Sequence, residues 1–261
     1  MNQGFGICML SVIPLRAEAS DKSEMVSQLL FGDKFQILER AGAWLRICTA
    51  YDDYEGWIDS KQITEIEKDV YSLLQADTIL GLQLLNEAIR LPDNEKILLL
   101  PGSTLPSYDE EGGCQINEHQ YKIKGKIKNV IPDDFASGIE RAAKFYLNTP
   151  YLWGGRTPFG IDCSGFSQVV YKQFGIRLKR DAWQQALHGE LVGFLQEVQP
   201  GDLAFFDNDE GKITHVGIML NDHQIIHASG RVKIDRIDNQ GIFSTDLNRY
   251  THKLRVVKRY S

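Results

Sequence analysis

The chain changes character at residues 160–166, which read GIDCSGF, where a Gly/Pro-rich loop meets a predicted helix. Apolar residues at helical spacing follow from about residue 164 to residue 174. Cys163 therefore falls at a helix start, where backbone N–H groups lack intrahelical partners and the helix dipole is positive. We expect this placement to lower the pKa of the thiol and to offer N–H groups to an oxyanion.

Around this junction the sequence predicts helices first and antiparallel strands afterwards. Helices are predicted over about residues 134–147, 164–174 and 182–187. Strands are predicted over residues 202–206, 213–220, 224–228, 233–237 and 254–257. With a turn at residues 132–134 as the boundary, this order predicts an α+β domain over residues 131–261.

Two of the six histidines lie in neighbouring predicted strands, His215 and His227. A hairpin centred on Asn221, pairing Met219 with His223, would place His215 directly opposite His227 on one face of the sheet. A two-residue turn would put the two rings on opposite faces, because side chains alternate along a strand. A shared role for the rings therefore predicts a loop with an odd number of residues.

A Cys nucleophile requires a base within reach, and the base requires a third polar group that fixes its tautomer. His215 is the predicted base and His227 the predicted orienting group. A zinc site formed by Cys163 and both histidines is the competing chemistry. The sequence offers no evident fourth ligand, and metal binding does not need a Cys at a helix start. We therefore expect neither a metal nor another cofactor.

Four segments carry a resemblance to a known family: TPYLWGGRTPFGIDCSGFSQVVYKQFGIRLKRDAWQQALHG (149–189), VQPGDLAFF (198–206), ITHVGIML (213–220) and IIHAS (225–229). In this order and spacing they resemble the NlpC-type cell-wall peptidases. The resemblance implies a minimal papain-like fold and a triad of Cys163, His215 and His227. It also implies cleavage beside γ-D-glutamyl residues of murein peptides.

The N-terminal third predicts a small β-barrel of short strands separated by turns. We expect a first strand over Ile7 to Ile13 and further strands at 28–31, 34–38, 44–48 and 56–58. Residues 13–59 resemble a bacterial SH3-like domain, through a Gly-Asp turn and a closing Gly-Trp-Ile. We assign residues 1–66 to this domain. Residues 67–130 are interpreted as a second, diverged SH3-like domain, from the strand-like runs 97–100 and 121–130.

With this front end, the whole chain is similar to the murein-recycling γ-D-glutamyl-L-diamino-acid peptidases. The resemblance places six side chains at the substrate: Tyr151, Asp162, Ser164, Asp181, Tyr54 and Glu24. That subgroup often has Ser after the Asp at position 181, where Ala182 stands here.

Simpler structural roles are open for several of these residues. Asp162 also suits a helix cap. Asp181 also suits a surface ion pair with Arg180, which would be worth little. Tyr54 lies among acidic residues in a predicted loop, where it would be solvated.

Composition bears on the remaining functional classes. The chain has 261 residues, 43% of them hydrophobic, and a net charge of −6, which argues against a nucleic-acid partner. No apolar run approaches the ~20 residues of a membrane helix. The four cysteines are scattered and do not indicate a disulfide framework. Without a signal-peptide pattern we expect a cytoplasmic location, with a periplasmic or secreted one as the alternative if the sequence is truncated.

Several functional hypotheses stay open on the sequence. The first is a dipeptidyl-peptidase that hydrolyses the γ-D-glutamyl–diamino acid bond of short murein peptides with a free N-terminal L-Ala. The second is a secreted hydrolase of intact wall, or an amidase or acyltransferase of the same fold. The third is a non-catalytic protein whose SH3-like modules bind the wall.

Overall fold

The computed structural model describes residues 4–74, 78–81, 86–109, 111–125 and 135–260. The chain divides into two compact units, residues 1–129 and 130–261. The predicted turn at 132–134 and the end of the predicted strand 121–130 lie outside the described residues. Among the described residues, no helix is both long enough and apolar enough to cross a membrane.

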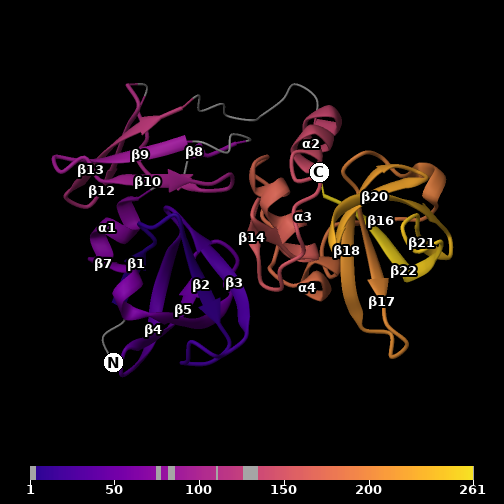
Figure 1. Ribbon diagram of the computed structural model, residues 1–261, viewed down its shortest axis with the longest axis horizontal. Coiled ribbons are helices and arrows are strands. Elements are labelled where there is room, and N and C mark those ends of the chain that lie inside the picture. The colour runs from indigo at the N-terminus through magenta and orange to yellow at the C-terminus, as the bar shows by residue number, and fades with distance from the viewer. Residues whose placement is uncertain (1–3, 75–77, 82–85, 110, 126–134, 261) are drawn as a thin grey trace. The chain divides into compact units, whose positions relative to one another are not determined.

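The first unit opens with a seven-stranded antiparallel sheet in the order β3-β2-β6-β5-β4-β1-β7 (Figure 1). Its elements are β1 (Gly4–Ile7), β2 (Val12–Arg16), β3 (Met25–Leu30), β4 (Lys34–Ala41), β5 (Trp44–Thr49), β6 (Glu55–Asp59), the 3-10 helix η1 (Ser60–Gln62) and β7 (Thr64–Ile66). Burial alternates along β2 and β5, as expected when one face of a strand covers a core.

The predicted single strand over Ile7 to Ile13 is wrong, because the chain leaves the sheet between β1 and β2. Cys8 donates its N–H to the Asp33 carbonyl at 2.9 Å and accepts from the Gly32 N–H at 2.7 Å. These bonds turn the backbone, so that β1 pairs with β4 and β7 while β2 pairs with β3 and β6.

The remainder of the first unit forms a four-stranded sheet in the order β10-β9-β13-β12 and a ribbon of β11 and β8. The elements are α1 (Lys68–Leu73), β8 (Thr78–Ile79), β9 (Asn86–Leu91), β10 (Lys96–Leu99), β11 (Thr104–Leu105), β12 (Gly113–Ile116) and β13 (His119–Lys124). One hydrophobic cluster joins Phe5 and Phe31 to Leu99 and Tyr121. The SH3-like identity of residues 67–130 stays a prediction.

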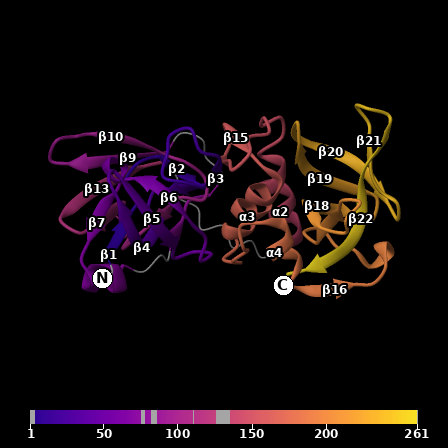
Figure 2. The ribbon, with the colours of Figure 1, turned by 90° about the horizontal axis from the view of Figure 1, so that it is seen from below.

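The second unit has helices first and antiparallel strands afterwards, as the sequence predicts. Its elements are α2 (Phe135–Lys144), β14 (Arg156–Thr157), β15 (Gly160–Ile161), α3 (Cys163–Lys172), α4 (Ala182–Ala186), β16 (Glu190–Val192), η2 (Leu195–Glu197), β17 (Leu203–Asp207), β18 (Ile213–Asn221), β19 (Gln224–Ser229), β20 (Arg231–Asp238), β21 (Gly241–Ser244) and β22 (Arg249–Arg259). Figures 1 and 2 show the three helices together on one side of the strands of this unit.

Strands β17 to β22 close into a barrel, because β21 pairs with β22 as well as with β20. Side chains from all these strands fill its interior, among them Phe206, Met219, Ile225 and Ile242. The opposite face of β18 and β19 is also buried, since α3 packs against both strands. The middle of this sheet is therefore shielded from solvent on both sides.

The β18–β19 hairpin does not have the predicted register. Met219 pairs with Ile225 rather than with His223. The turn between Asn221 and Gln224 contains two residues, so the predicted odd-numbered loop is wrong.

A β-bulge nevertheless keeps the two histidines on one face. Leu220 is an extra residue on β18, because the register shifts between Met219 and Asn221. This shift restores the parity that the even turn would have broken. His215 and His227 are diagonal neighbours and not a direct pair, since Gly217 is the residue that faces the His227 Cβ.

Candidate active site

Cys163 is the first residue of α3, and Asp162 caps the helix by accepting from the Gly165 N–H at 2.7 Å. The Cys163 side chain is buried, with an exposed fraction of 7%. The backbone N–H groups of Val216 and Ser164 are close enough to the sulfur to act against the rise of its pKa. The thiol therefore lies near the part of β18 that carries His215.

A buried ion pair fixes the start of α3. Arg180 donates from Nη2 to Asp162 Oδ2 at 2.5 Å and from Nη1 to Oδ1 at 3.1 Å. The same guanidinium donates to Ser164 Oγ at 2.9 Å, and the Gly154 N–H donates to Asp162 Oδ2 at 2.9 Å. In the sequence analysis, a surface ion pair of Arg180 with Asp181 was the simpler alternative to a substrate role of Asp181. The structure pairs Arg180 with Asp162, because the loop before α4 returns to the base of α3.

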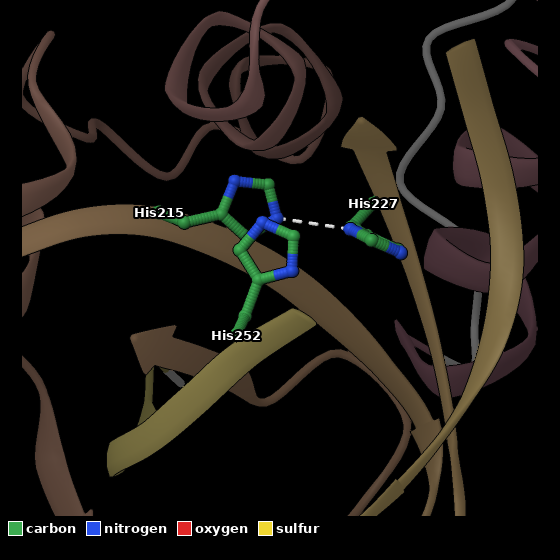
Figure 3. Close-up of side chains that lie close together, drawn as sticks. All are labelled: His215, His227 and His252. Atoms are coloured by element: carbon green, nitrogen blue, oxygen red, sulfur yellow. Dashed lines mark hydrogen bonds between the residues drawn. The ribbon is translucent and has the colours of Figure 1, made fainter. Parts of the chain in front are cut away.

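Three side chains from adjacent strands form a hydrogen-bonded line behind the thiol. His215 Nε2 lies 2.9 Å from His227 Nδ1, with the rings nearly perpendicular (Figure 3). His227 Nε2 lies 3.1 Å from Asp235 Oδ2. All three residues are buried. Sequence reasoning missed Asp235, because its place beside His227 depends on the register between β19 and β20.

A third histidine, His252 on β22, lies against the base. Its ring stacks on that of His215 with centroids 4.1 Å apart and planes 25° apart (Figure 3). Thr251 Oγ1 lies 2.9 Å from its Nδ1. Sequence reasoning interpreted this segment as an ordinary last strand. Closure of the barrel brings His252 to the site, and no local sequence pattern predicts that closure.

The three histidines are close enough to suggest a metal site, since one nitrogen of each lies within 4.8 Å of the others. An imidazole nitrogen binds a metal in the plane of its ring. The stacked planes of His215 and His252 do not converge on one ion at bonding distance. His227 Nδ1 is already bonded to His215. The arrangement as it stands suits proton transfer better than metal binding.

Burial sets the resting protonation of the thiol and its base. It raises the pKa of Cys163 to about 12, helped by the Asp162 charge, while the N–H of Val216 and the Arg180 charge lower it less. The predicted lowering of this pKa is therefore wrong, because desolvation outweighs the helix start. Burial, and then the neighbouring histidines, hold the pKa of His215 well below its usual value. Both shifts favour a neutral thiol and a neutral imidazole at rest.

The predicted substrate residues are distributed over both units. Burial, followed by the charges of Cys163 and Asp162, raises the pKa of Tyr151. Asp181 is the N-cap residue of α4, and its N–H donates to Gln184 Oε1 at 3.0 Å.

Tyr54 and Glu24 belong to the first unit. Tyr54 packs partly against the core of the first sheet, and the Glu24 carbonyl accepts from the Ala17 N–H at 2.9 Å. Their contact with substrate stays a prediction, as do the site roles of Tyr151, Asp162, Ser164 and Asp181.

Comparison with known proteins finds two matches to family models. The NlpC/P60 family matches residues 148–250, and the bacterial dipeptidyl-peptidase SH3 domain matches residues 15–63. The gamma-D-glutamyl-L-lysine dipeptidyl-peptidase of Bacillus cereus is 26% identical over 233 residues, which cover 80% of this chain and 68% of that protein. The Bacillus subtilis protein of the same name is 29% identical over 216 residues, covering 77% of this chain and 71% of that protein.

A solved NlpC/P60 family protein from Bacillus cereus has the same fold. It matches with a TM-score of 0.80 and 20% identity, over 98% of this chain and 99% of that chain.

We predict that Arg180→Met destabilises the second unit strongly. Removing one partner of a buried ion pair leaves the other charge unpaired, which costs about 3–5 kcal/mol. The matched control is Arg40→Met, which removes an ion pair with Glu65 whose side chains are about half exposed. That change is expected to cost at most about 1 kcal/mol. Urea unfolding measures both, and equal losses would contradict a special role for the buried pair.

We also predict that His252→Phe reduces the acid sensitivity of the fold while keeping a ring against His215. Burial, and then the charges of His227 and Lys233, lower the pKa of His252 from 6.5 to about 4. Between these values the unfolded chain binds a proton that the native state does not, so stability falls as the pH falls from about 6.5 to about 4. Urea unfolding across this range should show a shallower fall for the variant. An unchanged slope would mean that His252 does not stay neutral in the native state.

Proposed function

The chain combines an NlpC/P60 domain over residues 148–250 with a bacterial dipeptidyl-peptidase SH3 domain over residues 15–63, and from this premise we propose a cysteine peptidase of short murein peptides. The proposed reaction is hydrolysis of the bond between γ-D-glutamate and the following diamino acid, in peptides with a free N-terminal L-Ala. One observation carries the proposal. The Cys163 thiol lies at a helix start against the Val216 N–H, and the preceding residue, His215, is bonded to His227.

The proposed mechanism starts from a neutral thiol. Cys163 Sγ attacks the scissile carbonyl carbon while His215 accepts the thiol proton, so that no separated charge has to exist in the resting site. N–H groups at the start of α3 stabilise the oxyanion of the tetrahedral intermediate. Its collapse breaks the C–N bond, and the leaving amine takes the proton from the His215 imidazolium. Water activated by His215 then hydrolyses the thioester and frees Cys163.

The substrate class is inferred from two kinds of support. The Bacillus relatives are named for gamma-D-glutamyl-L-lysine dipeptidyl-peptidase activity. In this chain, Asp181 offers a carboxylate for a substrate ammonium group, and charge-assisted hydrogen bonds of this kind are strong. A cytoplasmic role in murein recycling belongs to the same proposal.

We expect Cys163→Ala and His215→Ala each to abolish hydrolysis, with losses of at least about 10³-fold, because nucleophile and base act as a unit. His227→Ala should be milder, since water can replace part of an orienting group. The matched control is Cys114→Ala, which alters a buried thiol bonded to the Pro106 carbonyl. Assays follow release of the diamino acid. Activity retained in Cys163→Ala would exclude the covalent route.

A substrate panel tests the dipeptidyl-peptidase specificity. It contains L-Ala-γ-D-Glu-L-Lys, its diaminopimelate counterpart, the N-acetylated forms of both, and intact murein sacculi. We expect free peptides to be cleaved at least about 100-fold faster than acetylated ones, because acetylation removes the positive charge that Asp181 is proposed to pair with. Similar rates on all substrates would favour a secreted wall hydrolase. No cleavage of any substrate by the folded chain would favour a non-catalytic wall-binding protein.

A further inference from the structure

We propose that Asp235 is a positioning residue of this site, which fixes, through His227, the ring nitrogen that His215 turns toward Cys163. The inference deepens the proposed function and rests on it, because it concerns how the base of that reaction is prepared. Asp235 is not expected to touch substrate, since His227 and His215 stand between it and the thiol.

The placement of Asp235 follows from the register of three adjacent strands. On β19 and β20, His227 pairs with Lys233, so Asp235 lies two residues along on the same face of the sheet. On β18 and β19, His215 is likewise two residues from Gly217, which faces His227. Both links are thus diagonal neighbours on one face. That face is the interior of the barrel, since Met219 and Ile225 belong to its core.

The hydrogen bonds along this line set the tautomers in sequence. An ionised carboxylate can only accept, so the bond to Asp235 Oδ2 requires the proton of His227 to sit on Nε2. The Nδ1 atom of neutral His227 then accepts, so His215 must donate from Nε2. The remaining nitrogen of His215, Nδ1, is left with a lone pair. Without the carboxylate, His227 is free to adopt the other tautomer, in which Nδ1 donates and this order is lost.

Several groups keep Asp235 ionised and aimed at His227. The Thr245 N–H donates to Asp235 Oδ1 at 3.0 Å, and Lys233 Nζ lies 3.1 Å from Oδ2. Although burial alone would raise the pKa of Asp235, the bonds from His227, the Thr245 N–H and Lys233 hold it well below its usual value. The carboxylate is thus charged throughout the range in which the enzyme would work.

The other charged and titratable groups around this point are few among the described residues. Asp246 lies 3.3 Å from Lys233 Nζ and is also paired with Arg231 at 3.3 Å. His252 on β22 is coupled to Asp235, His227 and Lys233 by charge. The bond to Asp235 and its charge favour a proton on His227, whereas the charge of Lys233 opposes it. Asp235 and Lys233 therefore have opposite effects on the pKa of His227.

The alternative is that Asp235 is only a structural ion-pair residue. The chain contains a matched example of that kind, Asp202, whose carboxylate is bonded to Arg259 at 2.8 Å and to the Gln199 N–H at 2.8 Å. Asp202 has an exposed fraction of 2% and Asp235 one of 3%, and both lie in the second unit. Of these two residues, only Asp235 is bonded to His227, the histidine that orients the proposed base.

The experiment compares the full chain with Asp235→Asn, Lys233→Met and Asp202→Asn. Thermal unfolding measures stability, steady-state kinetics on L-Ala-γ-D-Glu-L-Lys give kcat and KM, and the pH dependence of Cys163 alkylation by iodoacetamide is recorded without substrate. For Asp235→Asn we expect kcat to fall about 10- to 100-fold, less than the ~10⁴-fold loss seen when a directly bonded triad Asp is amidated. KM should stay within about twofold, since ground-state binding is not altered.

The alkylation profiles show in which direction each substitution shifts the pH dependence of Cys163 alkylation. Asp235→Asn should shift the profile to lower pH, because a negative charge that favours bound protons is removed. Lys233→Met should shift it to higher pH, and Asp202→Asn should leave both the profile and kcat unchanged while lowering the unfolding temperature.

Two results would overturn the inference. One is a wild-type profile and kcat in folded Asp235→Asn, and the other is a shift in the same direction for Asp235→Asn and Lys233→Met. If Asp235→Asn does not fold, the direction of the Lys233→Met shift decides alone. If the wild-type chain does not cleave the peptide but the profiles shift as expected, the substrate proposal fails and the role of Asp235 stands.

Discussion

The parity of β18 against β19 is the constraint on which the site depends. Side chains alternate along a strand, so a register slip of one residue would carry one histidine from the barrel interior to the face covered by α3. The even turn after Asn221 would cause that slip, and the extra residue Leu220 cancels it. The bulge thus places His215 and His227 2.9 Å apart. A local irregularity of one residue decides whether the molecule has a base with an oriented ring.

This geometry places a row of hydrogen-bonded polar side chains inside an otherwise apolar barrel. Unpaired polar groups are costly in such an interior, and paired ones are held in a fixed orientation. Each histidine is bonded to the next group, and Asp235 ends the line with bonds to Thr245 and Lys233. At the other side of the thiol, Arg180 and Asp162 hold the start of α3. Nucleophile and base are therefore positioned by separate buried networks that meet at Cys163.

The sequence predicted much of this arrangement because its signals are local. A Cys after a helix cap and apolar residues at helical spacing predicted the helix start and the helix order. The shared face of the two histidines was predicted through an odd loop, whereas the structure reaches it through an even turn and a bulge. The parts that were missed depend on distant pairing. Asp235 needs the β19–β20 register, Arg180 needs a chain return, and His252 needs the barrel to close. The expected low pKa of Cys163 failed for the same reason, since helix position is local while burial belongs to the whole fold.

Active-site labelling tests the central claim most directly, namely that Cys163 attacks the γ-D-glutamyl carbonyl of a peptide with a free amine. The reagent is an L-Ala-γ-D-Glu analogue with a chloromethyl ketone in place of the scissile amide, and peptide mass spectrometry locates the label. The account predicts one label per chain, on Cys163, with much slower labelling by the N-acetylated reagent. Labelling spread over Cys8, Cys48 and Cys114, or equal rates for both reagents, would contradict it.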